Sequence, residues 1–206
     1  MYKRQVLDCG VLKHFTQLLR HPRSNIQKEA AWTISNITAG QPHQIQCVVD
    51  AGLIPGVIDI MIKGEYKAQK EAVWAITNLT AGGSMEQIVY VVQAGALKPL
   101  CDLLVVKETK IVTVILDALI NILNAATKIQ QVEQVCLMIE ECDGLDRIEA
   151  LQQHHNVEVY RLALSIIDKF FSDEEEEDQT LVPDTSAGTF TFAPATQTVP
   201  AGGFSF

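Results

Sequence analysis

One segment of this chain occurs twice with few changes. Residues 28–40 read KEAAWTISNITAG and residues 70–82 read KEAVWAITNLTAG, so the second copy follows the first by 42 residues. Internal repeats with a period of about 40 to 47 residues are typical of helical solenoids, in which each unit packs mainly against its neighbours. The repeat therefore predicts an all-α solenoid, and it constrains the fold more than any other feature of the sequence.

Short motifs that end in glycine recur with nearly the same period. They lie at residues 8–10, 50–52, 93–95 and 141–144. Glycine accepts the positive φ angles of tight turns, so each motif predicts a turn between a short first helix and a second helix, followed by a long third helix. The first unit is expected to be incomplete, with Ser24 or Asn25 capping its third helix, and the fourth to have a longer first helix. The predicted units cover about residues 1–40, 41–83, 84–127 and 128–171.

The last 35 residues, 172–206, differ in composition from the solenoid. Asp173–Asp178 is a block of acidic residues, and 179–206 is rich in Thr, Pro, Ala and Gly, which predicts a disordered tail. Seven of the 25 acidic residues and no Lys or Arg lie in 173–206, so the net charge of −9 resides mainly in the tail. Because the body shows no basic patch, nucleic-acid binding is not expected.

Other features of the chain favour a soluble intracellular protein. Residues 1–20 lack the continuous apolar stretch of a secretory signal, and the apolar runs elsewhere look too short and too broken to span a bilayer. The five cysteines include no pair with the CxxC spacing of a zinc site. We therefore expect reduced thiols, no metal and no association with a membrane.

In each copy of the repeated segment, an acid, an indole and an amide are spaced by three and then four residues, so that they share one face of a helix. They are Glu29, Trp32 and Asn36 in the first copy, and Glu71, Trp74 and Asn78 in the second. An indole packs the aliphatic stem of Lys or Arg and attracts its cation, a carboxylate pairs with that cation, and an amide bonds a peptide backbone. The stripe therefore predicts a groove for an extended basic peptide.

The same stripe has a second interpretation, in which the tryptophans fill the core between repeats and the asparagines satisfy buried turns. Periodicity alone leans slightly toward core packing. The groove gains support because three positions that can make polar contacts recur on one face while the other faces vary among Ala, Val, Ile and Leu. In the third unit the corresponding residues are Val114, Asp117 and Asn121, so an indole-dependent groove should end after the second unit. No phosphate loop, nucleophile elbow or HExxH motif is present, so neither an enzyme nor a cofactor is expected.

The repeated segment closely resembles the armadillo repeats of importin-α (karyopherin-α). Residues 86–90, 138–142, 144–152 and 174–179 resemble the same family, and 203–206 resemble the tail of one subgroup. The resemblance covers nearly the whole chain. It implies a right-handed armadillo solenoid that corresponds to the last four repeats and the tail of importin-α.

Importin-α is an adaptor that carries nuclear localisation signals to importin-β, so the resemblance implies a protein of the cytoplasm and nucleus that binds the basic signals of cargo proteins. The matching positions belong to the minor signal site of the family. By motif match, Trp32 and Trp74 form its pockets, Asn36 and Asn78 clamp the peptide backbone, and Ser35, Glu29 and Glu71 contact basic side chains. The major-site repeats and the basic segment that binds importin-β have no counterpart here, so direct binding of importin-β is not expected.

The far end of the chain implies further partners. The last repeat and the acidic segment resemble the region that the nuclear export receptor binds together with Ran-GTP, and the same end of importin-α also binds folded cargoes and nucleoporin segments. Two alternatives to an import adaptor stay open. One is a truncated regulatory form that mainly binds the export receptor or non-classical cargo, and the other is a generic armadillo scaffold for acidic or apolar partners.

Overall fold

The computed structural model describes residues 10–172. These residues form helices joined by turns and short loops, and no strand occurs among them. One compact unit, Met1–Phe171, contains every helix given below. The predicted disordered tail lies, apart from Ser172, outside the described residues.

Helices of three kinds follow one another in the predicted order. The first helices are α4 (Pro42–Asp50), α7 (Met85–Gln93) and α10 (Val132–Glu140). The second helices are η1 (Val11–His14) with α2 (Phe15–Leu19), α5 (Ile54–Lys63), α8 (Leu97–Asp102) with η2 (Leu103–Val105), and α11 (Gly144–Ala150) with η3 (Leu151–Gln153). The third helices are α3 (Ser24–Thr38), α6 (Tyr66–Gly82), α9 (Thr109–Lys128) and α12 (Val157–Phe170).

The expected longer first helix of the fourth repeat is wrong. α10 has 9 residues, as α4 and α7 do, and the additional length lies in α9, which has 20. Because apolar residues continue through Ile122, Leu123 and Ala126 to the end of α9, the core holds this helix in place up to the turn before α10.

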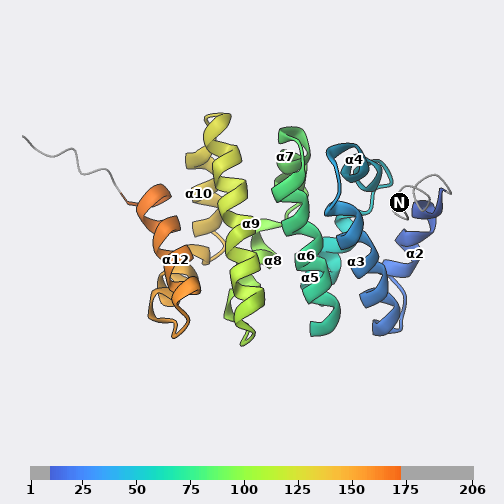
Figure 1. Ribbon diagram of the computed structural model, residues 1–206, viewed down its shortest axis with the longest axis horizontal. Helices are drawn as coiled ribbons and strands as arrows, with labels where there is room; N and C mark the ends of the chain where they lie inside the picture. Colours follow the sequence, from blue (N-terminus) through green and yellow to red (C-terminus); the bar gives the residue numbers. More distant parts are fainter. Residues whose placement is uncertain (1–9, 173–206) are drawn as a thin grey trace, which may run out of the picture. The chain divides into compact units, whose positions relative to one another are not determined.

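The third helices lie side by side along the unit, where α3 packs against α6, α6 against α9, and α9 against α12 (Figure 1). Each of them is buried on the faces that meet its neighbours. In α6 the buried positions include Ala68, Ala72 and Ala75, whose small side chains allow helices to approach closely, together with Ile76 and Leu79. The buried residues form one continuous core from Leu12 to Ile166, as expected when each repeat covers the next.

The turn that precedes each second helix recurs with the same backbone geometry. Gly10 and Gly52 both have φ of 64° and Gly95 has φ of 88°, in the left-handed region that favours glycine. In the fourth repeat Asp143 takes this conformation with φ of 55°, and the glycine, Gly144, follows it as the first residue of α11. The predicted glycine turn is therefore displaced by one residue in the last repeat.

Hydrogen bonds link the beginnings of successive third helices at two equivalent places. The Ser24 hydroxyl donates to Glu65 Oε2 at 2.7 Å, and the Tyr66 hydroxyl donates to Glu108 Oε2 at 3.1 Å. Lys70 Nζ also donates to Glu108, at 2.9 Å, and this bond is the main reason that the pKa of Glu108 is lowered. Ser24 does not cap its own helix, and no side chain caps the start of α3.

The expectation that every apolar run is too short to span a bilayer is wrong for α9. With 20 residues and a mean hydropathy of 1.5, α9 is long and apolar enough by length and composition, and two bent helix pairs pass the same test if each pair counts as one span. In the fold, 67% of the apolar window of α9 is buried. Its neighbours α6, α7, α10 and α12 cover it, so its apolar character serves the core between the repeats.

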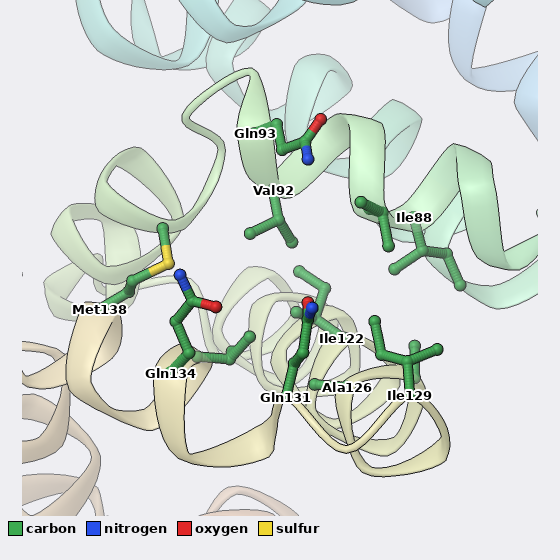
Figure 2. Close-up of a pocket in the computed structure, with 12 residues that line it drawn as sticks. Ile88, Val92, Gln93, Ile122, Ala126, Ile129, Gln131, Gln134 and Met138 are labelled. Atoms are coloured by element: carbon green, nitrogen blue, oxygen red, sulfur yellow. The ribbon is translucent and has the colours of Figure 1, made fainter.

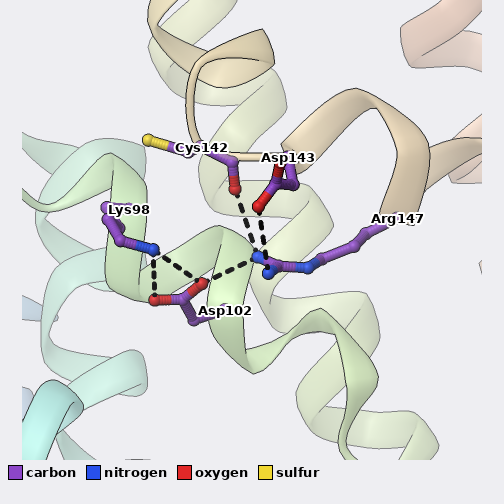
Figure 3. A network of polar contacts seen from close by, with 5 residues as sticks. All are labelled: Lys98, Asp102, Cys142, Asp143 and Arg147. Carbon is purple, nitrogen blue, oxygen red and sulfur yellow. Dashed lines mark hydrogen bonds and ion pairs between the residues drawn. The ribbon is translucent and has the colours of Figure 1, made fainter.

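A polar network joins the third repeat to the fourth (Figure 3). Lys98 Nζ donates to both carboxylate oxygens of Asp102, at 3.1 and 3.0 Å, within α8. Arg147 of α11 donates from Nη1 to Asp102 Oδ1 at 2.8 Å and to the Cys142 carbonyl at 3.3 Å, and its Nη2 lies 3.8 Å from Asp143 Oδ2. The Asp102 carboxylate thus holds two cations from two repeats.

We expect Asp102→Asn to lower the free energy of unfolding by about 1 kcal/mol at pH 7, because Lys98 and Arg147 both lose the charge of the carboxylate that they share at a partly exposed site. Burial raises the pKa of Asp102, but the hydrogen bonds from Lys98 and Arg147 outweigh it and hold the pKa below the ordinary value of 3.8. A lowered pKa stabilises the fold above the ordinary pKa of Asp, and this contribution is lost as the pH falls through the lowered value.

Urea unfolding at pH 7 and at pH 3 measures both effects. The difference between wild type and Asp102→Asn should shrink at pH 3, whereas Glu149→Gln, at an exposed acid of the same α11, should show little difference at either pH. A difference for Asp102→Asn that stays constant down to pH 2 would contradict the role of the carboxylate charge.

Candidate peptide-binding site

Residues of α3 and α6 surround a shallow hollow of about 240 Å³. Its lining consists of Trp32, Ser35, Asn36, Ala39, Glu71, Trp74 and Asn78. Six of the seven residues predicted for the groove are therefore brought together. Glu29 does not line the hollow, and Ala39, which the sequence did not single out, completes the wall on the α3 side.

The two indoles differ in their exposure. Trp32 is 52% exposed, which is unusual for so large an apolar side chain, whereas Trp74 is half-buried and packs partly against the core. Lys110 Nζ of α9 lies over the Trp74 ring, 5.5 Å from its centroid. The core-packing interpretation therefore holds in part for Trp74 and does not hold for Trp32.

The two predicted amides are both half-buried and bond differently. Asn36 Nδ2 donates to the Trp32 carbonyl in its own helix at 2.9 Å, and Asn78 Nδ2 donates across to the Ser35 carbonyl of α3 at 3.0 Å. Each amide keeps a second N–H and its oxygen for a further partner, which is the pair of groups that a peptide backbone needs. Ser35 is buried and donates its hydroxyl to the Trp32 carbonyl at 2.8 Å. Ser35 therefore contributes contact surface to the hollow, and its hydroxyl proton is already used within α3.

Two carboxylates give the hollow its charge. Burial raises the pKa of the half-buried Glu71, while Lys28 and Lys70 lower it and Glu29 raises it further. Glu29 is well exposed and pairs with Lys28 at 2.8 Å. Glu71 is thus a poorly solvated carboxylate at the wall of the hollow, and a cation that approaches such a carboxylate stabilises its charged form.

The indole row ends at α6. On α9, Asp117 takes the position of Trp74, and its pKa is raised by burial and by the nearby Glu158. Asn121 keeps the amide position but donates to Thr80 Oγ1 at 3.4 Å. The structure thus places no indole on the third repeat, as the sequence indicates.

A second and more enclosed hollow of about 270 Å³ lies between α7 and α10, against the end of α9 (Figure 2). Apolar side chains such as Ile88, Ile122 and Met138 line it together with three glutamines, and no charged residue takes part. It therefore lacks the carboxylates that a basic peptide requires. Sequence reasoning missed it because its lining residues follow the same pattern as the core. Within residues 10–172, no group of three or more His, Cys, Asp or Glu is placed to hold a metal.

Family models identify the repeats. The model of the Armadillo/beta-catenin-like repeat matches residues 1–39, 41–81 and 84–123. The chain belongs to the armadillo-repeat family. A model of the atypical Arm repeat matches residues 133–184, so the armadillo pattern also covers the fourth repeat.

Curated relatives of this armadillo protein include importin subunits. The chain is 47% identical over 199 residues to importin subunit alpha-4 of Arabidopsis thaliana, covering 92% of this chain and 36% of the relative. It is 40% identical over 249 residues to importin subunit alpha-1b of Oryza sativa subsp. japonica, covering 98% of this chain and 46% of the relative. The chain thus spans between about a third and a half of the length of these relatives, and the predicted resemblance to importin-α is confirmed.

Solved structures agree on the fold. A designed armadillo repeat protein in complex with the peptide (KR)4 superposes with a TM-score of 0.69 at 31% identity, over 82% of this chain and 67% of that one. Computationally designed armadillo repeat proteins for modular peptide recognition superpose with a TM-score of 0.72 at 30% identity, over 82% and 68%. The predicted armadillo solenoid is therefore confirmed.

Proposed function

We propose that this armadillo protein is a nuclear import adaptor, without catalytic activity, that binds basic nuclear localisation signals of cargo proteins. The signals would lie in the hollow between α3 and α6, which is called the trough from here on. The observation that carries the proposal is the hollow that the exposed indole of Trp32 and the half-buried indole of Trp74 line together with Glu71 and two amides. The identity to importin alpha subunits and the likeness to a designed solenoid in complex with (KR)4 support the same ligand chemistry.

Binding would combine three kinds of contact. The aliphatic stem of a Lys or Arg packs against Trp32 and Trp74, and its cation is attracted to the ring faces and to Glu71. Asn36 and Asn78 bond the extended peptide backbone through their free amide groups, as a neighbouring strand would. Alternate side chains of an extended peptide point the same way, so every second basic residue can enter the trough.

Partners at the other end are also part of the proposal. The export receptor with Ran-GTP, and nucleoporin segments or folded cargoes, would bind at the fourth repeat, where a hollow lined by Leu137, Glu133, Glu140 and Phe170 is open to solvent. The acidic segment that would contribute lies outside the described residues. Such shuttling would place the protein in both cytoplasm and nucleus.

Isothermal titration with a (KR)4 peptide tests the proposal, and a (DE)4 peptide of equal length is the control. We expect the basic peptide to bind and its affinity to fall steeply with salt, since the contacts are partly ionic and exposed. A preference for the acidic peptide would favour the generic scaffold. Binding of the export receptor with no binding of (KR)4 would favour the regulatory form.

We expect the affinity for (KR)4 to fall as the pH is lowered from 7 to 4. Burial raises the pKa of Glu71, so this carboxylate takes up a proton at a higher pH than an ordinary Glu and then no longer attracts a cation. Glu71→Gln should bind more weakly at pH 7 and show a shallower pH dependence, measured by titration at several pH values. Glu140→Gln, at an exposed acid of α10, is the control, and an unchanged pH dependence in Glu71→Gln would contradict this role.

A further inference from the structure

A lysine of the third repeat lies over Trp74 and is not among the residues that line the hollow. The hollow lies between Trp74 and α3, whereas Lys110 comes from α9 and places its Nζ over the indole, 5.5 Å from the ring centroid. We infer that Lys110 closes the trough at the third repeat by taking the place of a ligand cation on Trp74, and so limits the basic run of a peptide that can bind. Lys110 can act in this way on a peptide only if the proposed function holds.

Comparison of the repeats shows that this contact is particular to Trp74. Lys67 and Lys110 are both the second residue of a third helix, in α6 and α9. Both are exposed, yet among the contacts of residues 10–172 only Lys110 lies over an indole, and Lys67 makes no such contact with Trp32. Trp32 is 52% exposed, whereas Trp74 packs partly against the core and also has Lys110 over its ring.

The carboxylate nearest to Lys110 in sequence is already bonded by other side chains. The nearest carboxylate in sequence, Glu108, is held by Lys70 at 2.9 Å and by the Tyr66 hydroxyl at 3.1 Å. Glu108 still attracts Lys110 through space, but Lys110 forms no ion pair with it, and an ammonium without a contacting carboxylate is stabilised by the negative face of an indole. Lys110 therefore stays on the ring until a ligand displaces it.

The consequence for a ligand is electrostatic. A basic residue that continues past Trp74 would meet the Lys110 ammonium, which repels it, and would have to displace that ammonium to reach the ring. Beyond this point α9 offers Asp117 where an indole would be needed, so no aromatic surface receives the aliphatic stem. A peptide whose basic residues fill the trough and then give way to uncharged residues fits this end, because Lys110 repels a further cation and the carboxylates of Asp117 and Glu158 repel an anion.

Titration of (KR)4 into charge-matched variants tests the inference. Lys110→Ala should bind about 3- to 10-fold more tightly than Lys67→Ala, the range that corresponds to release of one exposed cation–π contact and one like charge. The affinity of Lys110→Glu for (KR)4 should exceed that of Lys67→Glu by a larger factor. Lys110→Arg should bind (KR)4 as tightly as the wild type does. Equal affinities for the Lys110 and Lys67 variants would overturn the inference, because both change the net charge equally.

A second measurement needs no peptide. The chain has 2 tryptophans, so in a Trp32→Phe background the fluorescence reports on Trp74 alone. Quenching by acrylamide, which is uncharged, should increase when Lys110→Ala is added and stay unchanged when Lys67→Ala is added. Increased quenching with no binding of (KR)4 to the wild type would show that Lys110 covers Trp74 and that the proposed function fails. Unchanged quenching would overturn the inference itself.

Discussion

Replacing Trp32 by alanine is expected to weaken the binding of (KR)4 by roughly 30-fold, or about 2 kcal/mol, without a measurable change in stability. Truncation of a central aromatic contact commonly has an effect of this size on binding. Because Trp32 is 52% exposed in the free protein, its removal leaves little cavity, and the free energy of unfolding should stay within about 0.5 kcal/mol of wild type. Titration and thermal unfolding of the same sample separate the two effects.

Trp74→Ala should behave differently, since the half-buried ring of Trp74 also packs against the core. We expect a comparable loss of affinity together with a loss of stability of about 1 to 3 kcal/mol. Leu137→Ala, at an apolar side chain of α10 that is 58% exposed, is the control for removing exposed apolar surface, and it should leave peptide affinity unchanged. Wild-type affinity in Trp32→Ala would remove the main support for the proposed groove.

Gly144→Val is expected to destabilise the fourth repeat by about 3 kcal/mol, at the upper end of what overpacking usually costs. A Cβ atom on Gly144 would lie 2.6 Å from Cys101 Sγ, 2.7 Å from Ile139 Cγ2 and 2.8 Å from the Ile139 carbonyl. The carbonyl belongs to the backbone before the turn, so it cannot move aside as a flexible side chain can. Hydrogen exchange should show α10–α12 opening more readily than the first two repeats.

Gly82→Ala is the control for adding a side chain at a glycine with open surroundings, and its effect on the free energy of unfolding should have the opposite sign to that of Gly144→Val. A Cβ atom on Gly82 would come no closer than 3.5 Å to another atom, which is ordinary van der Waals contact, and Gly82 ends the long α6. Alanine there should stabilise the protein by up to about 1 kcal/mol, because the unfolded chain loses freedom. Because solenoid repeats contact only their neighbours, Gly144→Val should still bind (KR)4. Loss of that binding would contradict the expected local effect.

The period of the sequence predicts most of this fold, because a solenoid repeats the same local pattern and needs few contacts between distant segments. The 42-residue repeat predicts α3 and α6 and places Trp32 beside Trp74. The same spacing indicates that the indole row ends before α9. Helix periodicity is sufficient for these inferences because residues three and four apart must share a face.

Side-chain partners could not be predicted in the same way. The sequence predicts Ser24 as a possible helix cap, but its hydroxyl bonds Glu65 of the next repeat. The sequence also places Glu29 in the groove, but Glu29 pairs with Lys28 and does not line the hollow. Long or small polar side chains choose among partners that only the packed neighbour supplies, so a pattern within one helix does not determine them. The position of Lys110 over Trp74 depends on the packing of α9 against α6 and has no signal in the repeat.

The Asn78 amide has a consequence for the mechanics of the molecule. It spans from α6 to the Ser35 carbonyl of α3 at 3.0 Å, and it also lines the hollow in which a peptide would lie. A ligand that draws this amide toward itself would loosen the junction between two repeats, and a pull that separates the repeats would shift the amide away from the ligand. The force needed to separate α3 from α6 would then depend on whether a peptide is bound. Stretching single molecules with and without peptide would measure this difference.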